Sequence, residues 1–161
     1  YVSICSPNYL HDAHIRFGLR MGADVICEKP IVLNPWNLDA LEELEKEYKG
    51  NIYNILQLRL HDSVIKLKEG IDNGPKNEVY DIDLQYYTSR GKWYHHSWKG
   101  NLDKSGGIAT NIGVHFFDML MWVFGDSASF TVEQQDKRTI RGTLELERAT
   151  VNWFLSYDYN I

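Results

Sequence analysis

Two short motifs in this sequence carry side chains that could bind a small molecule or move a proton. The first is Cys27-Glu28-Lys29-Pro30, which follows the apolar run 23–26. A proline cannot continue the interior of a sheet, so this motif predicts a strand end that presents an ammonium group. In the second motif Asn111, His115 and Asp118 have i, i+4, i+7 spacing. On a helix these three side chains would share one face.

The second motif favours acid–base chemistry. A histidine with Asn and Asp one turn away on either side is predicted to be oriented for proton transfer. The structural alternatives are a solvated strand end for Lys29 and an ordinary core histidine for His115. We expect no metal site, because no cysteine or carboxylate completes a ligand set with the histidine pairs (His11 with His14, His95 with His96).

The first fifty residues are predicted to position the lysine. An apolar strand at 2–5 is followed by the turn Ser6-Pro7-Asn8, in which Asn8 is expected to cap a helix that ends at Gly22. A second strand at 24–27 completes a βαβ unit with parallel strands. Both strand ends then lie at the same sheet edge, where ligands bind in open α/β sheets.

The pattern changes after residue 51, and the fold class we predict is a parallel α/β beginning joined to an α+β sheet domain. The proposed domains are 1–50 and 51–161. Their expected elements are a helix opened by Asn34-Pro35, strands at 52–60 and 79–87, helices at 61–72 and 110–124, an irregular aromatic stretch at 88–104, and strands at 129–135, 140–147 and 150–157 in an antiparallel meander.

Composition narrows the classes of partner. The 161 residues are 43% hydrophobic and carry a net charge of −5 with no block of Lys or Arg, so neither nucleic acid nor an anionic membrane is an expected partner. The longest apolar stretch, 114–124, is too short to span a bilayer. Cys5 and Cys27 are expected to be thiols in a reducing compartment, with a disulfide left open. An opening inside a strand, without Met or a charged leader, predicts a piece of a longer protein.

The motifs occur in a recognisable order along the whole chain. Ser6-Pro7-Asn8 with His11 comes first, then Glu28-Lys29-Pro30, then Gly106-Gly107 leading into Asn111-x-x-x-His115. This order resembles the Gfo/Idh/MocA family of NAD(P)-dependent sugar oxidoreductases. Segment 97–118 is similar to the branch that oxidises the 3-hydroxyl of UDP-N-acetylglucosaminuronic acid (UDP-GlcNAcA) in bacterial surface-polysaccharide synthesis. The resemblance implies the C-terminal part of a Rossmann domain, followed by an open, mostly antiparallel sheet with helices on one face.

The resemblance also implies roles for individual residues. Lys29 would hydrogen-bond the reacting hydroxyl, His115 would accept its proton, and Asn111 would hold the hydroxyl. NAD is the expected cofactor, and NADP is left open. The cofactor contacts implied are Ser6, Pro7, Asn8, His11, Glu28 and Lys29, and the substrate contacts are Arg59, Trp98, Lys99, Thr110 and Asn111.

The sequence departs from the family pattern at two points, and two other functions are open. The usual Asp is Asn111 here, and the family's glycine-rich loop is absent from this sequence, so these 161 residues alone are expected to bind NAD poorly and to be inactive. The resemblance implies a cytoplasmic homo-oligomer, a dimer or tetramer formed through the C-terminal sheet. The alternatives are another sugar or inositol dehydrogenase of the family and a non-catalytic sugar-binding member.

Overall fold

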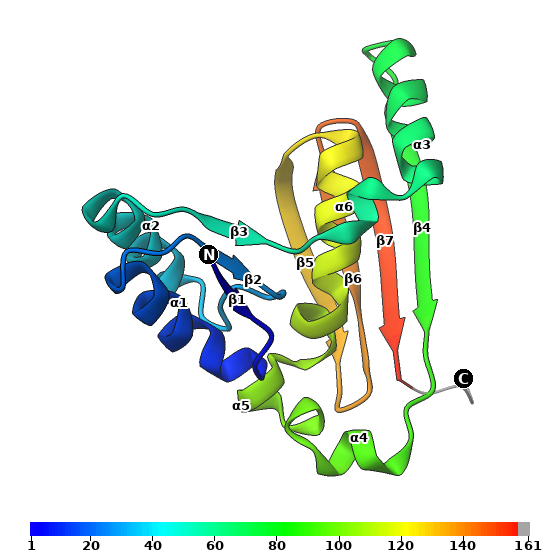
Figure 1. Cartoon of the computed structure of the whole chain (residues 1–161). Coiled ribbons are helices and arrows are strands. Elements are labelled where there is room, and N and C mark those ends of the chain that lie inside the picture. Colours follow the sequence, from blue (N-terminus) through cyan, green and yellow to red (C-terminus); the bar gives the residue numbers. More distant parts are fainter. Residues whose placement is uncertain (158–161) are drawn as a thin grey trace. The chain divides into compact units, whose positions relative to one another are not determined.

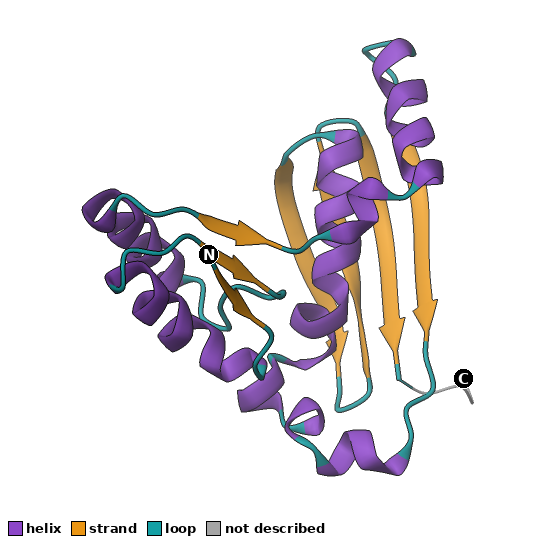
Figure 2. Ribbon diagram, viewed as in Figure 1, coloured by secondary structure: helices purple, strands orange, loops and turns teal. Residues whose placement is uncertain are grey.

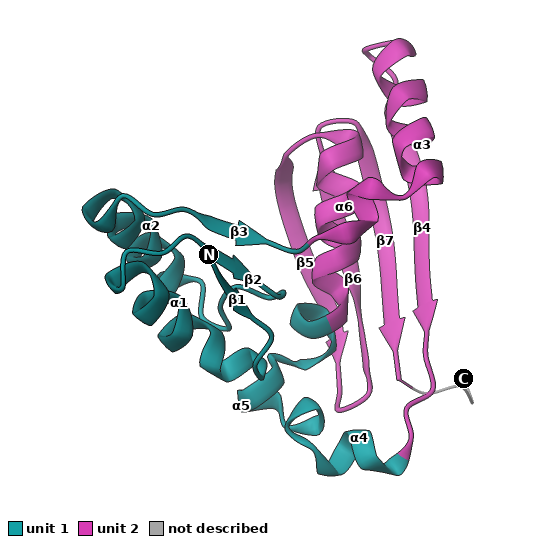
Figure 3. Cartoon of the chain, in the orientation of Figure 1, with its two compact units in different colours: residues 1–55, 92–111 teal, residues 56–91, 112–161 magenta. Residues whose placement is uncertain are grey.

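The structure, a computed structural model, describes residues 1–157, and its chain divides into two compact units (Figure 3). Unit 1 comprises Tyr1–Ile55 and Lys92–Asn111, and unit 2 comprises Leu56–Gly91 and Ile112–Ile161. Each unit contains its own β-sheet with helices beside it (Figure 2). The domain boundary proposed from the sequence stays a prediction, and the fold is described here unit by unit.

Unit 1 contains a parallel sheet of three short strands in the order β1-β2-β3 (Figure 1). The strands are β1 (Val2–Ile4), β2 (Val25–Cys27) and β3 (Ile52–Asn54). The connections are helices α1 (His11–Arg20) and α2 (Trp36–Tyr48). The predicted βαβ unit and its parallel strands are confirmed.

The core of unit 1 forms where α1 and α2 bury their apolar stripes against this sheet. Ile15 and Leu19 of α1 are fully buried, as are Val25 and Cys27 of β2, and Leu41 of α2 is 2% exposed. Helix α1 stops where Gly22 takes a φ of +75°, a left-handed conformation that favours glycine and that the sequence predicted.

Unit 1 also includes a run of short turns from the later part of the chain. These are α4 (Lys92–His96), η3 (Trp98–Gly100) and α5 (Leu102–Ser105), and α5 contacts η1 (Asn8–Leu10), the turn that follows β1. The segment expected to be irregular is therefore mostly helical turns.

Unit 2 is a four-stranded sheet in the order β4-β7-β6-β5. Strands β5, β6 and β7 form the predicted antiparallel meander, while β4 pairs with β7 in parallel. The bounds are β4 (Tyr80–Tyr87), β5 (Ser127–Gln135), β6 (Thr139–Leu146) and β7 (Ala149–Ser156), preceded by η2 (Gln57–Leu60) and α3 (Asp62–Asn73).

One face of this sheet is covered by α6 (Val114–Phe124) (Figure 1). The ring centroids of Phe117 and Trp153 lie 5.2 Å apart, and those of Tyr80 and Phe124 lie 5.8 Å apart. Alternate residues of β4 are half-buried and exposed, because successive side chains point to opposite faces of a sheet. The mixed sheet with a helix on one face confirms the predicted fold class.

Two predicted elements differ from the structure. The strand expected at 52–60 ends at Asn54, because its partner β2 is only three residues long and offers no further ladder. Residues Gln57–Leu60 instead form a 3₁₀ turn. The helix expected from residue 110 begins as a π-helical turn, Ala109–Gly113, which widens the backbone before α6.

By length and composition alone, the largely helical stretch Leu102–Phe124 is apolar enough to cross a membrane. In its most apolar window 39% is buried, and the core helices of soluble proteins pass the same test. This stretch is therefore weak support for a membrane span.

Candidate functional site

Lys29 lies two residues after the end of β2, at the carboxyl edge of the parallel sheet of unit 1. Its ammonium Nζ donates a hydrogen bond of 2.5 Å to the backbone carbonyl oxygen of Asn111. The side chain is part-buried, so this charge-assisted bond is shielded from bulk water. The strand end thus presents an ammonium group that is hydrogen-bonded to the backbone rather than fully solvated.

Asn111 connects this lysine to two other segments, and we call Asn8, Tyr94 and Asn111 the asparagine hub. The Asn111 amide oxygen accepts from Asn8 Nδ2 at 3.2 Å, and the Asn111 amide Nδ2 donates to the Tyr94 hydroxyl at 3.2 Å. All three side chains are buried. The hub is a neutral network that holds the carbonyl acceptor of Lys29 in place.

Asn8 does not cap a helix, so that prediction was wrong. The turn after β1 is 3₁₀, with no side-chain capping bond, and Asn8 Nδ2 instead donates to Asn111 and to the backbone oxygen of Ser105 at 3.0 Å. Those partners lie about a hundred residues further along the chain. Tertiary partners bury the amide more completely than a local cap would.

His11 connects the turn after β1 with the turn after β2 by hydrogen bonds. The imidazole is fully buried, with Nδ1 2.7 Å from the Pro30 carbonyl oxygen and Nε2 2.8 Å from the Ser6 carbonyl oxygen. Ser6, Pro7 and Glu28 are only partly buried, and Ser6 Oγ lies 2.9 Å from His14 Nδ1. His11 therefore shapes the edge, while the partly exposed residues are the ones open to a ligand.

In unit 2, His115 is on the first turn of α6 and is half-buried. Asp118, one turn later, is expected to orient this imidazole, and that role stays a prediction. Its carboxylate accepts two hydrogen bonds from Arg59, one from Nε at 2.7 Å and one from Nη2. These hydrogen bonds raise the pKa of the Arg59 guanidinium above its usual value.

The Asp118→Asn variant is expected to lose about 1 to 3 kcal/mol of unfolding free energy, because Asp118 is only 11% exposed and its carboxylate charge balances the Arg59 guanidinium. Urea unfolding checks this. Asp12→Asn is the matched control, since Asp12 pairs with Arg16 in the same two-bond geometry on α1 with both side chains about a quarter exposed. That control should cost less than about 1 kcal/mol. Equal losses in the two variants would contradict the assignment.

The remaining substrate candidates lie in unit 1, apart from Arg59. Trp98 and Lys99 are on η3, and Thr110 is in the π-helical turn. Thr110 packs against Gly106, whose φ is +79° and where an added Cβ would meet the Thr110 Cβ at 2.7 Å. Only glycine fits there, so Gly106 sets how the chain enters the turn that carries Asn111.

Two residues of this region escaped the sequence analysis, Tyr94 and Ser105. Tyr94 is 2% exposed and Ser105 is 1% exposed, although both lie in a stretch with no periodic pattern. No local signal distinguishes Tyr94 from the aromatic residues around it. Its importance comes from the hydrogen bond with Asn111, a contact that only the folded chain reveals.

The two cysteines differ sharply in environment. Burial raises the pKa of Cys27 to about 12, with smaller contributions from Glu28 and Cys5, whereas Cys5 is exposed. A raised pKa keeps the Cys27 thiol protonated and unreactive at neutral pH. We expect a chromogenic disulfide reagent at pH 8 to titrate one thiol in the native polypeptide and two in denaturant. Two fast-reacting thiols in the native state would contradict this.

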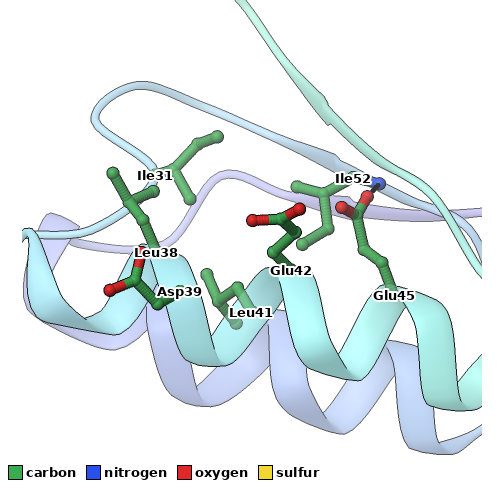
Figure 4. Close-up of a pocket in the computed structure, with 7 residues that line it drawn as sticks. All are labelled: Ile31, Leu38, Asp39, Leu41, Glu42, Glu45 and Ile52. Atoms are coloured by element: carbon green, nitrogen blue, oxygen red, sulfur yellow. Dashed lines mark hydrogen bonds between the residues drawn. The ribbon is translucent and has the colours of Figure 1, made fainter.

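A shallow pocket of about 260 Å³ lies beside α2 (Figure 4). Two of its carboxylates already have partners: Glu42 binds Lys46, and Glu45 accepts from the backbone N–H of Ile52. It contains none of the predicted site residues, so it is separate from the candidate site. Its lining is Ile31, Leu38, Asp39, Leu41, Glu42, Glu45 and Ile52. Within residues 1–157, no three His, Cys, Asp or Glu side chains lie close enough to hold a metal ion.

Known proteins share this arrangement over nearly the whole chain. The WlbA (WbpB) dehydrogenase from Thermus thermophilus, solved in complex with NAD and UDP-GlcNAcA, superposes with a TM-score of 0.93 and 48% identity, covering 98% of this chain and 51% of that one. The WlbA dehydrogenase from Bordetella pertussis, at 20% identity and a TM-score of 0.86 over 98% of this chain and 53% of that one, supports the fold alone. D-glucoside 3-dehydrogenase of Escherichia coli is 27% identical over 77% of this chain and 35% of that protein.

The chain thus spans about half the length of the solved relatives. The family model for the NAD-binding Rossmann fold of the oxidoreductase family matches residues 1–55. The model for its C-terminal alpha/beta domain matches residues 68–158. Together the two matches cover both sheets described above, and the chain belongs to the Gfo/Idh/MocA oxidoreductase family.

Proposed function

We propose that the protein containing these residues oxidises the 3-hydroxyl of UDP-GlcNAcA with NAD, in the synthesis of bacterial surface polysaccharide. The observation that carries this proposal is the 48% identity over 98% of the chain with a WlbA dehydrogenase solved with NAD and UDP-GlcNAcA. The fixed ammonium group of Lys29 supports it, because oxidation of an alcohol needs a cation near the oxygen that loses its proton.

The residues at the sheet edge would contact the nicotinamide half of NAD. Ser6, Pro7 and Glu28 are partly exposed at the carboxyl ends of the parallel strands β1 and β2, the edge at which nucleotides bind in such sheets. Asn8 and His11 lie buried behind them and hold the turns in shape. When bound, NAD supplies the acceptor for the hydride that leaves the substrate carbon.

The chain's own residues would handle the proton and the oxygen. Lys29 would donate a hydrogen bond to the reacting hydroxyl and stabilise its negative charge as the proton departs. His115 would accept that proton through a ring nitrogen, acting as general base. Asn111 would hold Lys29 through its backbone oxygen and, as an amide, would not act as a base.

Substrate contacts would come from residues that carry positive charge or aromatic surface. Arg59 keeps 42% of its side chain exposed although two of its nitrogens bind Asp118. An arginine held in this way could meet the carboxylate of the uronic acid. Trp98, Lys99 and Thr110 complete the proposed set.

We also propose a cytoplasmic homo-oligomer, a dimer or tetramer, that forms through the sheet of unit 2. The support is the edge strand β5, on which the apolar side chains of Phe130 and Val132 are 71% and 49% exposed. Sedimentation velocity on the longest native polypeptide would distinguish a monomer from either oligomer.

The test of the reaction is NADH formation, followed by absorbance, when the longest native polypeptide containing these residues is mixed with UDP-GlcNAcA and NAD. Growth of the NADH signal only with substrate, or a single-turnover burst if NADH stays bound, is the expected result. Turnover with free glucosides or inositols and none with UDP-GlcNAcA would overturn the substrate assignment and retain the oxidoreductase class.

A further inference from the structure

His11 is a titratable side chain in the core of unit 1 that takes no part in the proton transfer described above. Its imidazole is fully buried, and each ring nitrogen faces a backbone carbonyl oxygen. Nδ1 lies 2.7 Å from the oxygen of Pro30, and Nε2 lies 2.8 Å from the oxygen of Ser6. Both distances are those of an N–H···O hydrogen bond. The two nitrogens therefore have partners of the same chemical kind.

The nature of these partners decides how many protons the ring carries. A carbonyl oxygen only accepts hydrogen bonds, so a ring nitrogen that bonds to it must donate. A neutral imidazole has one N–H and one bare nitrogen, whereas a cationic imidazole has two N–H groups. In the neutral form a nitrogen lone pair would face the lone pairs of one of the two carbonyl oxygens, which is repulsive. Both hydrogen bonds form together only when His11 carries two protons and a positive charge.

This positive charge has no acidic partner. Within residues 1–157, no carboxylate lies within ion-pair distance of His11, and the adjacent Asp12 binds Arg16 through both of its oxygens. The first turn of α1 opposes a cation through the helix dipole, and the two charge-assisted bonds to carbonyl oxygens offset that cost. Because the charge is buried and unpaired, its field is weakly screened at the carboxyl ends of β1 and β2.

We propose that His11 is a buried imidazolium and a positioning residue that favours the reduced form of the bound cofactor. Its two N–H groups tie the turn at Ser6 to the turn at Pro30, which carries Lys29. Its charge repels the cationic nicotinamide ring of NAD more than the neutral ring of NADH. The charge therefore favours hydride transfer from the substrate carbon to NAD. This inference rests on the proposed function, since it takes NAD to bind at this edge of the sheet.

Nitrogen-15 NMR of the longest native polypeptide, labelled in histidine, tests the protonation at neutral pH without cofactor or turnover. We expect two one-bond N–H correlations from the His11 ring, because burial protects both protons from exchange with water. Couplings across the hydrogen bonds to the labelled carbonyl carbons of Ser6 and Pro30 assign the two signals in the wild type, so no variant is needed. One N–H correlation and one bare ring nitrogen would overturn the proposal.

Calorimetry with NAD and with NADH tests the effect of the charge on the cofactor. In His11→Gln the side chain is neutral and keeps an N–H donor, so the ratio of the Kd for NAD to the Kd for NADH should fall about 3- to 30-fold. A loss of structure alone would weaken both forms alike and leave this ratio unchanged. His61→Gln is the matched control, because His61 is exposed and bonds to the neighbouring Ser63, and its ratio should equal that of the wild type.

The outcomes separate this inference from the proposed reaction. A singly protonated His11, or a wild-type Kd ratio in His11→Gln, in a protein that oxidises UDP-GlcNAcA would overturn the inference and leave the reaction standing. A doubly protonated His11 and a lowered Kd ratio in His11→Gln, in a protein that does not oxidise UDP-GlcNAcA, would support the inference and reject the proposed substrate.

Discussion

The His115→Ala variant is expected to lose about 10²- to 10⁴-fold in kcat, because the group proposed to accept the hydroxyl proton would be missing. His115 is half-buried on the first turn of α6, and its replacement by alanine leaves a small space near the helix surface. The Kd for UDP-GlcNAcA should stay near the wild-type value, since the role proposed for the imidazole belongs to the chemical step. Steady-state NADH formation gives kcat, and calorimetry gives the Kd.

Two controls sharpen this result. Added imidazole should restore part of the rate of His115→Ala, because a small base can enter the vacated space. His61→Ala should keep wild-type turnover, since His61 is exposed and its ring bonds to the neighbouring Ser63. Wild-type kcat in His115→Ala would assign the proton to a different group.

Lys29→Met is expected to lower kcat by about 10²- to 10³-fold, because the developing alkoxide would lose its cation. Methionine has nearly the same length as the aliphatic part of lysine, so the change removes the charge with little effect on packing. NAD affinity, measured by calorimetry, should change little, since Lys29 is bonded to the Asn111 carbonyl oxygen and is proposed to act on the substrate hydroxyl.

Lys46→Met is the matched substitution for Lys29→Met. Lys46 is 70% exposed on α2 and pairs with Glu42, so its removal should leave kcat unchanged. A thermal melt of both variants tests the structural alternative. If Lys29→Met melted far below the wild type and lost NAD binding as well, the lysine would be a support for the fold rather than a participant in the reaction.

Elements set by local pattern were predictable from the sequence. The C-terminal ends of α1 and α6 were predictable because each helix stops at a glycine, Gly22 or Gly125, that adopts a positive φ. The alternation in β4 follows from a sheet with one covered face. Lys29 at the end of β2 was predicted because a strand followed by proline must stop.

Features set by distant partners were not predictable in this way. Asn8 has the residue type and position of a cap, but Ser105 and Asn111 provide its hydrogen bonds. Asp118 lies one turn from His115, but the spacing along α6 did not reveal that its carboxylate also accepts two hydrogen bonds from Arg59. A sequence pattern gives the spacing along one element and says little about which other segment competes for the same side chain.

The asparagine hub makes three sequence positions interdependent. The Asn111 amide donates to Tyr94 and accepts from Asn8 at the same time, which an aspartate cannot do because a carboxylate only accepts. Placing the family's more usual Asp at this position would also put a charge on a side chain that is only 8% exposed. The effect of any substitution at 111 should therefore depend on the residues at 8 and 94. We expect natural homologues to change these positions together, and single-residue transplants between branches of the family to fail where joint transplants succeed.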